Sequence, residues 1–500
     1  MQQTLKSISV ALALLIVTSG AGHGFDFSQL ENSVREHTLE NGMKFIVLER
    51  HEAPVVSFII RANVGSVDDP KEYTGMAHMF EHMAFKGTKS IGSKNIDEEL
   101  KLMAAEDSIM MELRSERLKG RLADSARIAA LSQSFETARQ AAYAMVVPNA
   151  YQELLRSEGA VGMNASTSPD ATNYYYSLPS NKLELWMALD SDRFLDPVLR
   201  EMYKERDVVA EERRMSVENS PSGKMYEELL GMAYKAHPYG IRGIGHMSDI
   251  QNLTRTAARQ FFDKYYSPAN LVAAIVGDVN ADEVFRLAEQ YWSRIPDRPR
   301  PERIVTVEPE QTGERRMVIE DRAQPMYLAA WHIPEGTHPD RPAIDAMLDY
   351  LGGGRTSLLH KSLVKEKKIA SRVSINPGGV GDKYPTLIIA NALPSQGHTN
   401  AECEAEILTQ IEKMKADLVP MAELEKIKAR AKADFIQGLE GNPGLARQLA
   451  TYEIYWGDWR AMFRELDRIN AVTAEEIQRV ATKYLTVPNR TVVTIETRKS

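Results

Sequence analysis

The residues His78, Glu81 and His82 form the motif of this sequence whose spacing most clearly indicates chemistry. They lie in the apolar segment 75–83. If this segment is helical, the two histidines stand four residues apart and project from one face. Two neutral imidazoles with a carboxylate beside them can hold a zinc ion and activate a water molecule. The order His-x-x-Glu-His therefore predicts a zinc hydrolase. A pair of core histidines on a buried helix is the alternative.

A third protein ligand is needed, and an acidic segment at 202–215 offers three carboxylates. Glu205 and Glu212 are seven residues apart, which is two helical turns, so they share a face. Glu211 is the third. Spacing does not choose among the three, and an amphipathic helix with solvated or Arg-paired carboxylates is the alternative.

The composition is that of an ordinary soluble protein of two to four domains. The chain has 500 residues, of which 43% are hydrophobic and 26% charged. Its net charge of -8 gives no electrostatic case for nucleic acid as a partner. Cys403 is the only cysteine, so neither an intrachain disulfide nor a thiolate zinc cluster can form.

The first 24 residues have the pattern of a bacterial signal peptide. Lys6 provides a positive start, residues 8–17 form an apolar run, and residues 19–22 are small. The run is too short for a stable membrane span. We expect a cleaved signal peptide (1–24) and a secreted or periplasmic protein, with an uncleaved anchor as the alternative.

The chain repeats itself. Similar helix-then-strand patterns surround Lys264 and Lys483, which are 219 residues apart, whereas prolines after the first strands, Pro54 and Pro325, are 271 residues apart. The first half therefore carries about 52 extra residues. The helix-forming segment 98–147, almost free of Gly and Pro, accounts for them as a helical hairpin.

These patterns predict an α+β fold of two homologous domains. Each is a mainly antiparallel sheet covered by helices, and the first carries the hairpin insertion. The proline-rich segment 295–312 is the expected linker. It separates a zinc-binding domain at 25–294 from a domain without a zinc site at 313–500.

Three segments, 75–88, 164–176 and 205–212, resemble in this order the signatures of the insulinase/pitrilysin metallopeptidases, which include mitochondrial processing peptidase. The resemblance implies His78, His82 and Glu212 as ligands of one zinc ion per chain. It implies Glu81 as the general base and Glu205 as a supporting carboxylate.

The segment around Asn164 and Ala165 has the small polar side chains of a short strand. An exposed edge strand can pair with an extended peptide backbone and bind it with little sequence selection. The resemblance places Asn164 and Ala165 beside the metal and implies peptide substrates. An ordinary strand or loop is the alternative.

The second half departs from the family pattern. It has no His-x-x-Glu-His motif, and the family's substrate-binding Arg and Tyr positions fall on Val364 and Ser371. We therefore expect a homologous partner subunit that supplies this pair, in a heterodimer rather than a homodimer.

The expected function is a zinc-dependent endopeptidase that hydrolyses unfolded peptides in an enclosed chamber. A peptide-binding or assembly subunit with a structural zinc is the first alternative. A zinc hydrolase of non-peptide amides is the second.

Overall fold

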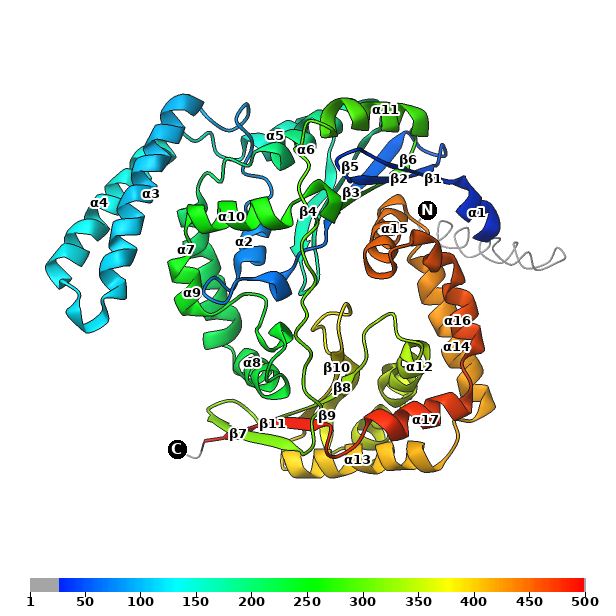
Figure 1. Cartoon of the computed structure of the whole chain (residues 1–500). Helices are drawn as coiled ribbons and strands as arrows, with labels where there is room; N and C mark the ends of the chain where they lie inside the picture. The colour runs from blue at the N-terminus through cyan, green and yellow to red at the C-terminus, as the bar shows by residue number, and fades with distance from the viewer. Residues whose placement is uncertain (1–26, 499–500) are drawn as a thin grey trace, which may run out of the picture.

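The computed structural model describes residues 27–498, so the predicted signal peptide lies outside the described residues. Figure 1 shows two sheets, each with helices packed on it, one above the other in that view. Within the described part of the chain, no helix combines the length and the apolar character that crossing a bilayer requires.

The first sheet has six strands, and its central strands are apolar runs. All seven residues of the strand at 271–277 are buried, as expected for a strand covered on both faces. In spatial order the strands are β1 (Val34–Thr38), β2 (Lys44–Glu49), β6 (Leu271–Gly277), β3 (Val55–Ala62), β5 (Thr172–Pro179) and β4 (Val161–Thr167).

The second sheet repeats this topology. Its five strands are, in spatial order, β7 (Arg315–Asp321), β11 (Arg490–Thr497), β8 (Met326–Ile333), β10 (Thr386–Pro394) and β9 (Ala370–Pro377). In each sheet one pair is parallel, β2 with β6 and β7 with β11. The other pairs are antiparallel. The predicted α+β fold of two homologous, mainly antiparallel sheets is confirmed.

The helices divide between the halves along the chain. Those of the first half are α1 (Phe27–Ser33), α2 (Met76–His82), α3 (Ile96–Leu118), α4 (Ser125–Ala144), α5 (Ala150–Ser157), α6 (Leu183–Leu195), α7 (Met202–Arg213), α8 (Pro221–Ala233), α9 (Met247–Asn252), α10 (Arg255–Tyr265) and α11 (Ala281–Trp292). Those of the second half are α12 (Arg341–Gly352), α13 (Asn400–Ala416), α14 (Met421–Gln437), α15 (Asn442–Trp456), α16 (Glu465–Ala471) and α17 (Ala474–Tyr484).

In each half, one helix packs on the sheet of the other half. The buried face of α15, including Leu445 and Leu449, packs on residues such as Ile59 and Ala274 of the first sheet. In the opposite direction α8 packs on β8, β10 and β11 of the second sheet. Figure 1 shows α15 beneath the first sheet and α8 beside the second. The sequence repeat did not predict this exchange.

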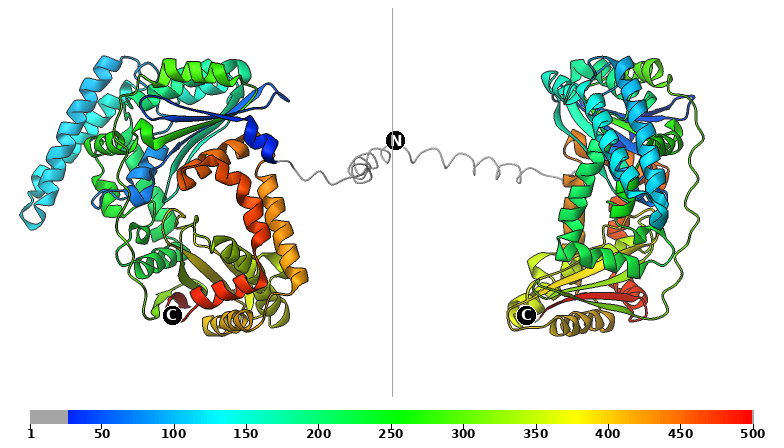
Figure 2. Two further views of the ribbon diagram at one scale, coloured as in Figure 1. Left: turned by 45° about the vertical axis from the view of Figure 1, so that its right-hand side comes forward. Right: turned by 90° about the vertical axis from the view of Figure 1, so that its left-hand side faces the viewer.

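The helices α3 and α4 pack against each other and project from the first half (Figure 2). Asp124 caps α4 by accepting hydrogen bonds from the backbone N–H groups of Ala126 and Arg127. Gly120 adopts a φ of 57° in the turn between the helices. The two helices occupy most of the segment in which the sequence predicts a hairpin.

A buried carboxylate, Asp170, joins the two halves beside the site described below. It sits in the turn between β4 and β5 and accepts hydrogen bonds from the backbone N–H of Asp382 (2.6 Å) and of Lys383 (3.1 Å). The hydroxyls of Tyr239 and Tyr455 also donate to it. These bonds fix the β9–β10 loop of the second half against the end of β4.

Candidate metal centre

The helix that carries the His-x-x-Glu-His motif, α2, begins where Asp69 caps it. The Asp69 carboxylate accepts hydrogen bonds from the backbone N–H of Gly75 (2.7 Å) and of Ala77 (2.8 Å). Gly75 adopts a φ of 89°, and a Cβ there would lie 2.6 Å from the carbonyl oxygen of Ile244. Glycine is therefore required at the start of α2, the helix of the motif.

The two faces of α2 differ in chemistry. Met76, Ala77, Met79 and Phe80 are buried in the core of the first half, whereas the motif residues are only partly buried. The imidazole rings of His78 and His82 therefore leave the same side of the helix, with centroids 4.9 Å apart. This is the arrangement that the four-residue spacing predicts.

The acidic helix α7 supplies the opposing carboxylates. Glu212 points toward both imidazoles, and Glu205, two turns earlier, reaches His82. Glu211 points elsewhere: it pairs with Arg214, and its side chain is 65% exposed. The structure thus separates three acids between which spacing could not choose.

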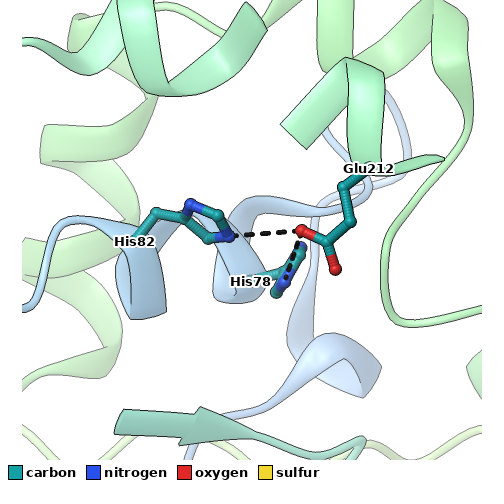
Figure 3. Close-up of side chains that lie close together, drawn as sticks. All are labelled: His78, His82 and Glu212. Carbon is teal, nitrogen blue, oxygen red and sulfur yellow. Dashed lines mark ion pairs between the residues drawn. The ribbon is translucent and has the colours of Figure 1, made fainter. Parts of the chain in front are cut away.

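His78, His82 and Glu212 form a group that fits a zinc ion. The Oε2 atom of Glu212 lies 3.7 Å from Nε2 of His78 and 3.4 Å from Nε2 of His82 (Figure 3). One ligand atom from each residue lies within 4.8 Å of the others. Tetrahedral zinc with bonds of about 2.0–2.2 Å places neighbouring ligand atoms about 3.4 Å apart. Two imidazole nitrogens and one carboxylate are also a donor set that zinc accepts in catalytic sites.

Glu205 contacts His82 at the ring nitrogen that faces away from Glu212. Its Oε2 atom lies 3.4 Å from Nδ1 of His82, and its Oε1 atom accepts a hydrogen bond from Nζ of Lys86 at 2.5 Å. A carboxylate on the second ring nitrogen fixes the imidazole's orientation and raises its basicity as a ligand. Sequence reasoning missed Lys86, although it follows His82 by four residues.

The two histidines differ in their surroundings. Burial lowers the pKa of His78, which favours the neutral imidazole that a metal binds, and its Nδ1 has no protein hydrogen-bond partner in the described part of the chain. The hydrogen bond to Glu205 raises the pKa of His82. Burial acts to raise the pKa of Glu205, but the hydrogen bonds from His82 and Lys86 outweigh it and lower that pKa.

Glu81 is the free carboxylate of the motif. It lies in the last turn of α2 and is partly exposed, and its charge acts on both imidazoles. Among residues 27–498 its carboxylate has neither a hydrogen bond nor an ion-pair partner. A carboxylate in this position can accept a proton without first losing a partner.

The predicted substrate strand is β4, which forms the edge of the first sheet and packs against α2. Asn164 is exposed and its side-chain oxygen accepts the backbone N–H of Ala165 at 2.9 Å, while the Ala165 side chain is buried. Thr167 donates to the carbonyl oxygen of Ala77 at 3.4 Å. The open edge of β4 therefore runs beside the motif helix.

The second half has neither an arginine nor a tyrosine at the two positions where the family resemblance implies them. Val364 packs against the core of the second half. Ser371 lies on the edge strand β9 and donates to the carbonyl oxygen of Leu393 at 3.1 Å. Neither side chain offers a cation or a phenol.

The site opens on a cavity of about 320 Å³ between the two halves. His78 and Glu212 line one side, and Gly379 and Val380 of the β9–β10 loop line the other. No local pattern in the sequence predicts this cavity, because its walls come from segments that are far apart along the chain.

Two models of known protein families together match most of the chain. The family described as "Insulinase (Peptidase family M16)" matches residues 44–112 and 146–245, and "Peptidase M16 inactive domain" matches residues 252–431. The interruption of the first match, residues 113–145, covers the end of α3 and all of α4.

Individual proteins agree with this assignment. Zinc protease PqqE of Helicobacter pylori is 29% identical over 96% of both chains. The crystal structure of a protease from Helicobacter pylori has a TM-score of 0.75 and 26% identity, and the match covers 93% of this chain and 99% of that one. The periplasmic protease PqqL of Escherichia coli shares the fold alone, with a TM-score of 0.67 and 16% identity, over 93% of this chain and 48% of its own.

The order of motifs, the two repeated sheets and these matches lead to one assignment. The chain belongs to the insulinase family of peptidases, peptidase family M16.

Proposed function

We propose that the chain is a zinc-dependent endopeptidase that hydrolyses unfolded peptides. The observation that carries the proposal is the convergence of His78, His82 and Glu212 with the unpaired carboxylate of Glu81 one residue from a ligand. Relatives named zinc proteases support it. A structural zinc would have no need of a free carboxylate at this place.

The residues of the site divide the chemistry among themselves. A zinc ion held by His78, His82 and Glu212, one per chain, would supply Lewis-acid polarisation of the scissile carbonyl. Glu81 takes a proton from the attacking water and returns it to the leaving amine. Glu205 holds the ring of His82 in place.

Substrate binding follows from the edge strand. An extended peptide that pairs with β4 near Asn164 and Ala165 would have its backbone beside α2. Such pairing needs an unfolded segment, because a folded substrate has already satisfied its own backbone hydrogen bonds. The cavity between the halves is the start of the enclosed chamber in this proposal.

We also propose a homologous partner subunit that contributes the arginine and tyrosine missing at Val364 and Ser371. Support comes from the Escherichia coli protease PqqL, of which this fold covers 48%, so that chain has room for a second unit of similar size. The chain purified alone should show little activity and gain it when the partner is added. Full activity of the lone chain would reject the partner.

The proposed location is outside the cytoplasm, after cleavage of residues 1–24. Its support is the sequence of that segment and the naming of PqqL as periplasmic. N-terminal mass spectrometry of the protein from its native host tests it. A mature chain that begins between residues 21 and 26 is expected, and an intact first residue would contradict it.

The decisive test of the function is Glu81→Gln. We expect this variant to keep one zinc per chain but to lose cleavage of a long unstructured peptide by at least about 100-fold. Glu211→Gln is the matched control, because Glu211 neighbours a ligand in sequence but faces Arg214. Retained turnover in Glu81→Gln would remove Glu81 from the mechanism. Zinc and peptide binding without cleavage by the wild type, tested with its partner, would favour the non-catalytic alternative.

A further inference from the structure

The cavity beside the candidate metal centre is lined by a cation that forms no ion pair within residues 27–498. Arg242 lines this cavity together with His78 and Glu212. Among residues 27–498, no carboxylate oxygen lies within 4.0 Å of the Arg242 side-chain nitrogens. By contrast, the nearby Arg213 is paired with Glu227 at 2.9 Å. Arg242 is therefore available to an anion that enters from the cavity.

The guanidinium of Arg242 is held in position by uncharged groups. Its Nη1 atom donates to the carbonyl oxygen of Gly223 at 3.2 Å, and its Cζ atom lies 5.8 Å from the ring centroid of Tyr226. The Tyr226 hydroxyl in turn donates to the carbonyl oxygen of Gly378 at 2.8 Å. A planar guanidinium with one donor engaged keeps others for a carboxylate, which it can bind with two parallel hydrogen bonds.

The loop that carries Arg242 is fixed to both metal-binding helices. Arg213, which follows the ligand Glu212, donates to the carbonyl oxygen of Gly245. The backbone N–H of His246 donates to Oγ1 of Thr74 at 2.8 Å, immediately before α2. The loop and the metal centre therefore form one rigid unit, so the position of Arg242 relative to the ligands is set by the fold.

The cavity also continues the path of the substrate strand. Thr167, the last residue of β4, lines it with Ser168 and Pro169. A peptide paired with β4 rises about 3.3 Å per residue, so a residue close to the cleaved bond would place its side chain in this cavity. That side chain would meet Arg242.

We propose that Arg242 forms a carboxylate-binding subsite, which selects peptides with an acidic group within a few residues of the cleaved bond. This inference rests on the proposed peptidase function. The carboxylate can come from an Asp or Glu side chain or from the free C-terminus of the peptide. Both present the same two oxygens to the guanidinium.

The test uses the full chain with its partner and a parent peptide without acidic residues. In one series a single Glu is moved through three positions on each side of the cleaved bond, with Gln at the same position as the reference. In a second series the peptide ends in a carboxylate or an amide, at the same distances. Cleavage rates are measured, and binding to the zinc-free protein is measured by fluorescence anisotropy.

We expect at least one Glu position or the free C-terminus to be favoured over its neutral counterpart by about 10- to 100-fold, in kcat/KM and in affinity. Arg242→Met, which keeps the apolar stem, should abolish this preference and change neutral peptides less than about twofold. Arg214→Met is the control, since Arg214 is 41% exposed and does not line the cavity. The series that shows the preference identifies the source of the carboxylate.

Equal cleavage and binding of acidic and neutral peptides by the wild type would overturn the subsite while leaving the peptidase function intact. A preference that survives in a folded Arg242→Met, or in Arg242→Gln should the first variant not fold, would overturn it too. Acid-selective binding that needs Arg242, without cleavage of any peptide, would instead reject the peptidase function and leave the subsite standing.

Discussion

Replacing Glu205 with Gln tests how the protein tunes its metal centre. The perturbation removes a charge but keeps the shape, 3.4 Å from Nδ1 of His82. It also takes from Lys86 its closer partner, since the remaining carboxylate, Glu201, lies 3.4 Å from Nζ. The side chain of Glu205 is only 12% exposed, so solvent cannot replace the lost interaction fully.

The expected size of the effect follows from this geometry. Loss of a carboxylate that supports a metal-binding histidine costs about 10- to 100-fold in metal affinity. The long separation of 3.4 Å places Glu205→Gln near the lower end, at about tenfold or about 1.4 kcal/mol.

The assay is competition for zinc against a chromophoric chelator at fixed pH, because metal affinity depends on ligand protonation. Glu201→Gln is the matched control: Glu201 also contacts Lys86, and it contacts Lys204 at 3.0 Å, but it does not touch His82. Affinities of the two variants that agree within a factor of two would refute the role assigned to Glu205.

Three further outcomes are expected. Burial raises the pKa of Asp68 to about 6 from 3.8, so its contribution to stability is present below about pH 4 and is lost as the pH rises through 6. The free energy of unfolding of Asp68→Asn should therefore fall less between pH 4 and pH 8 than that of the wild type. The difference between the two falls should be at most about 3 kcal/mol, since the carboxyl is partly exposed. Parallel pH profiles of the two proteins would contradict this. Leu449→Ala should lower the free energy of unfolding by about 2–5 kcal/mol, measured as a lower urea midpoint, because Leu449 is buried. Leu418→Ala, at a 47% exposed position, should change it little. Similar losses of stability in both variants would argue against the packing of α15 on the first sheet. Removal of zinc by a chelator should lower the melting temperature by a few degrees, which corresponds to about 3 kcal/mol at a hundredfold excess of zinc over its Kd. Only a metal that fits the site should restore the melting temperature. If the melting temperature stayed unchanged after measured loss of the metal, the metal would not bind selectively to the folded state.

The parts of the site that the sequence predicts are those encoded by short-range spacing. His78 and His82 share a face because four residues make about one helical turn, and the small polar residues around Asn164 mark an edge strand. Spacing alone does not predict whether Glu211 or Glu212 faces the two histidines. It depends on the rotation of α7, which its buried side chains, such as Tyr203 and Val209, determine by packing.

The fold shows the same division. The repeat and the strand patterns predict two similar sheets, because each strand records its own burial along the chain. They do not predict that α8 covers the second sheet and α15 the first. The pattern of an amphipathic helix indicates which of its faces is buried, but not which element covers that face. The position of Arg242 in the same cavity as His78 and Glu212 is also set by tertiary structure, because it depends on the loop that Thr74 and Arg213 hold in place.

The exchange of α8 and α15 makes the two halves interdependent in folding. A fragment that stops in the segment between α11 and β7 would leave one face of its sheet without α15, and the complementary fragment would lack α8. Each piece alone would present a bare apolar surface to water and aggregate, whereas the two expressed together could reassemble. The same interlocking couples the movements of the two halves, because each sheet is covered by a helix that belongs to the other half of the chain.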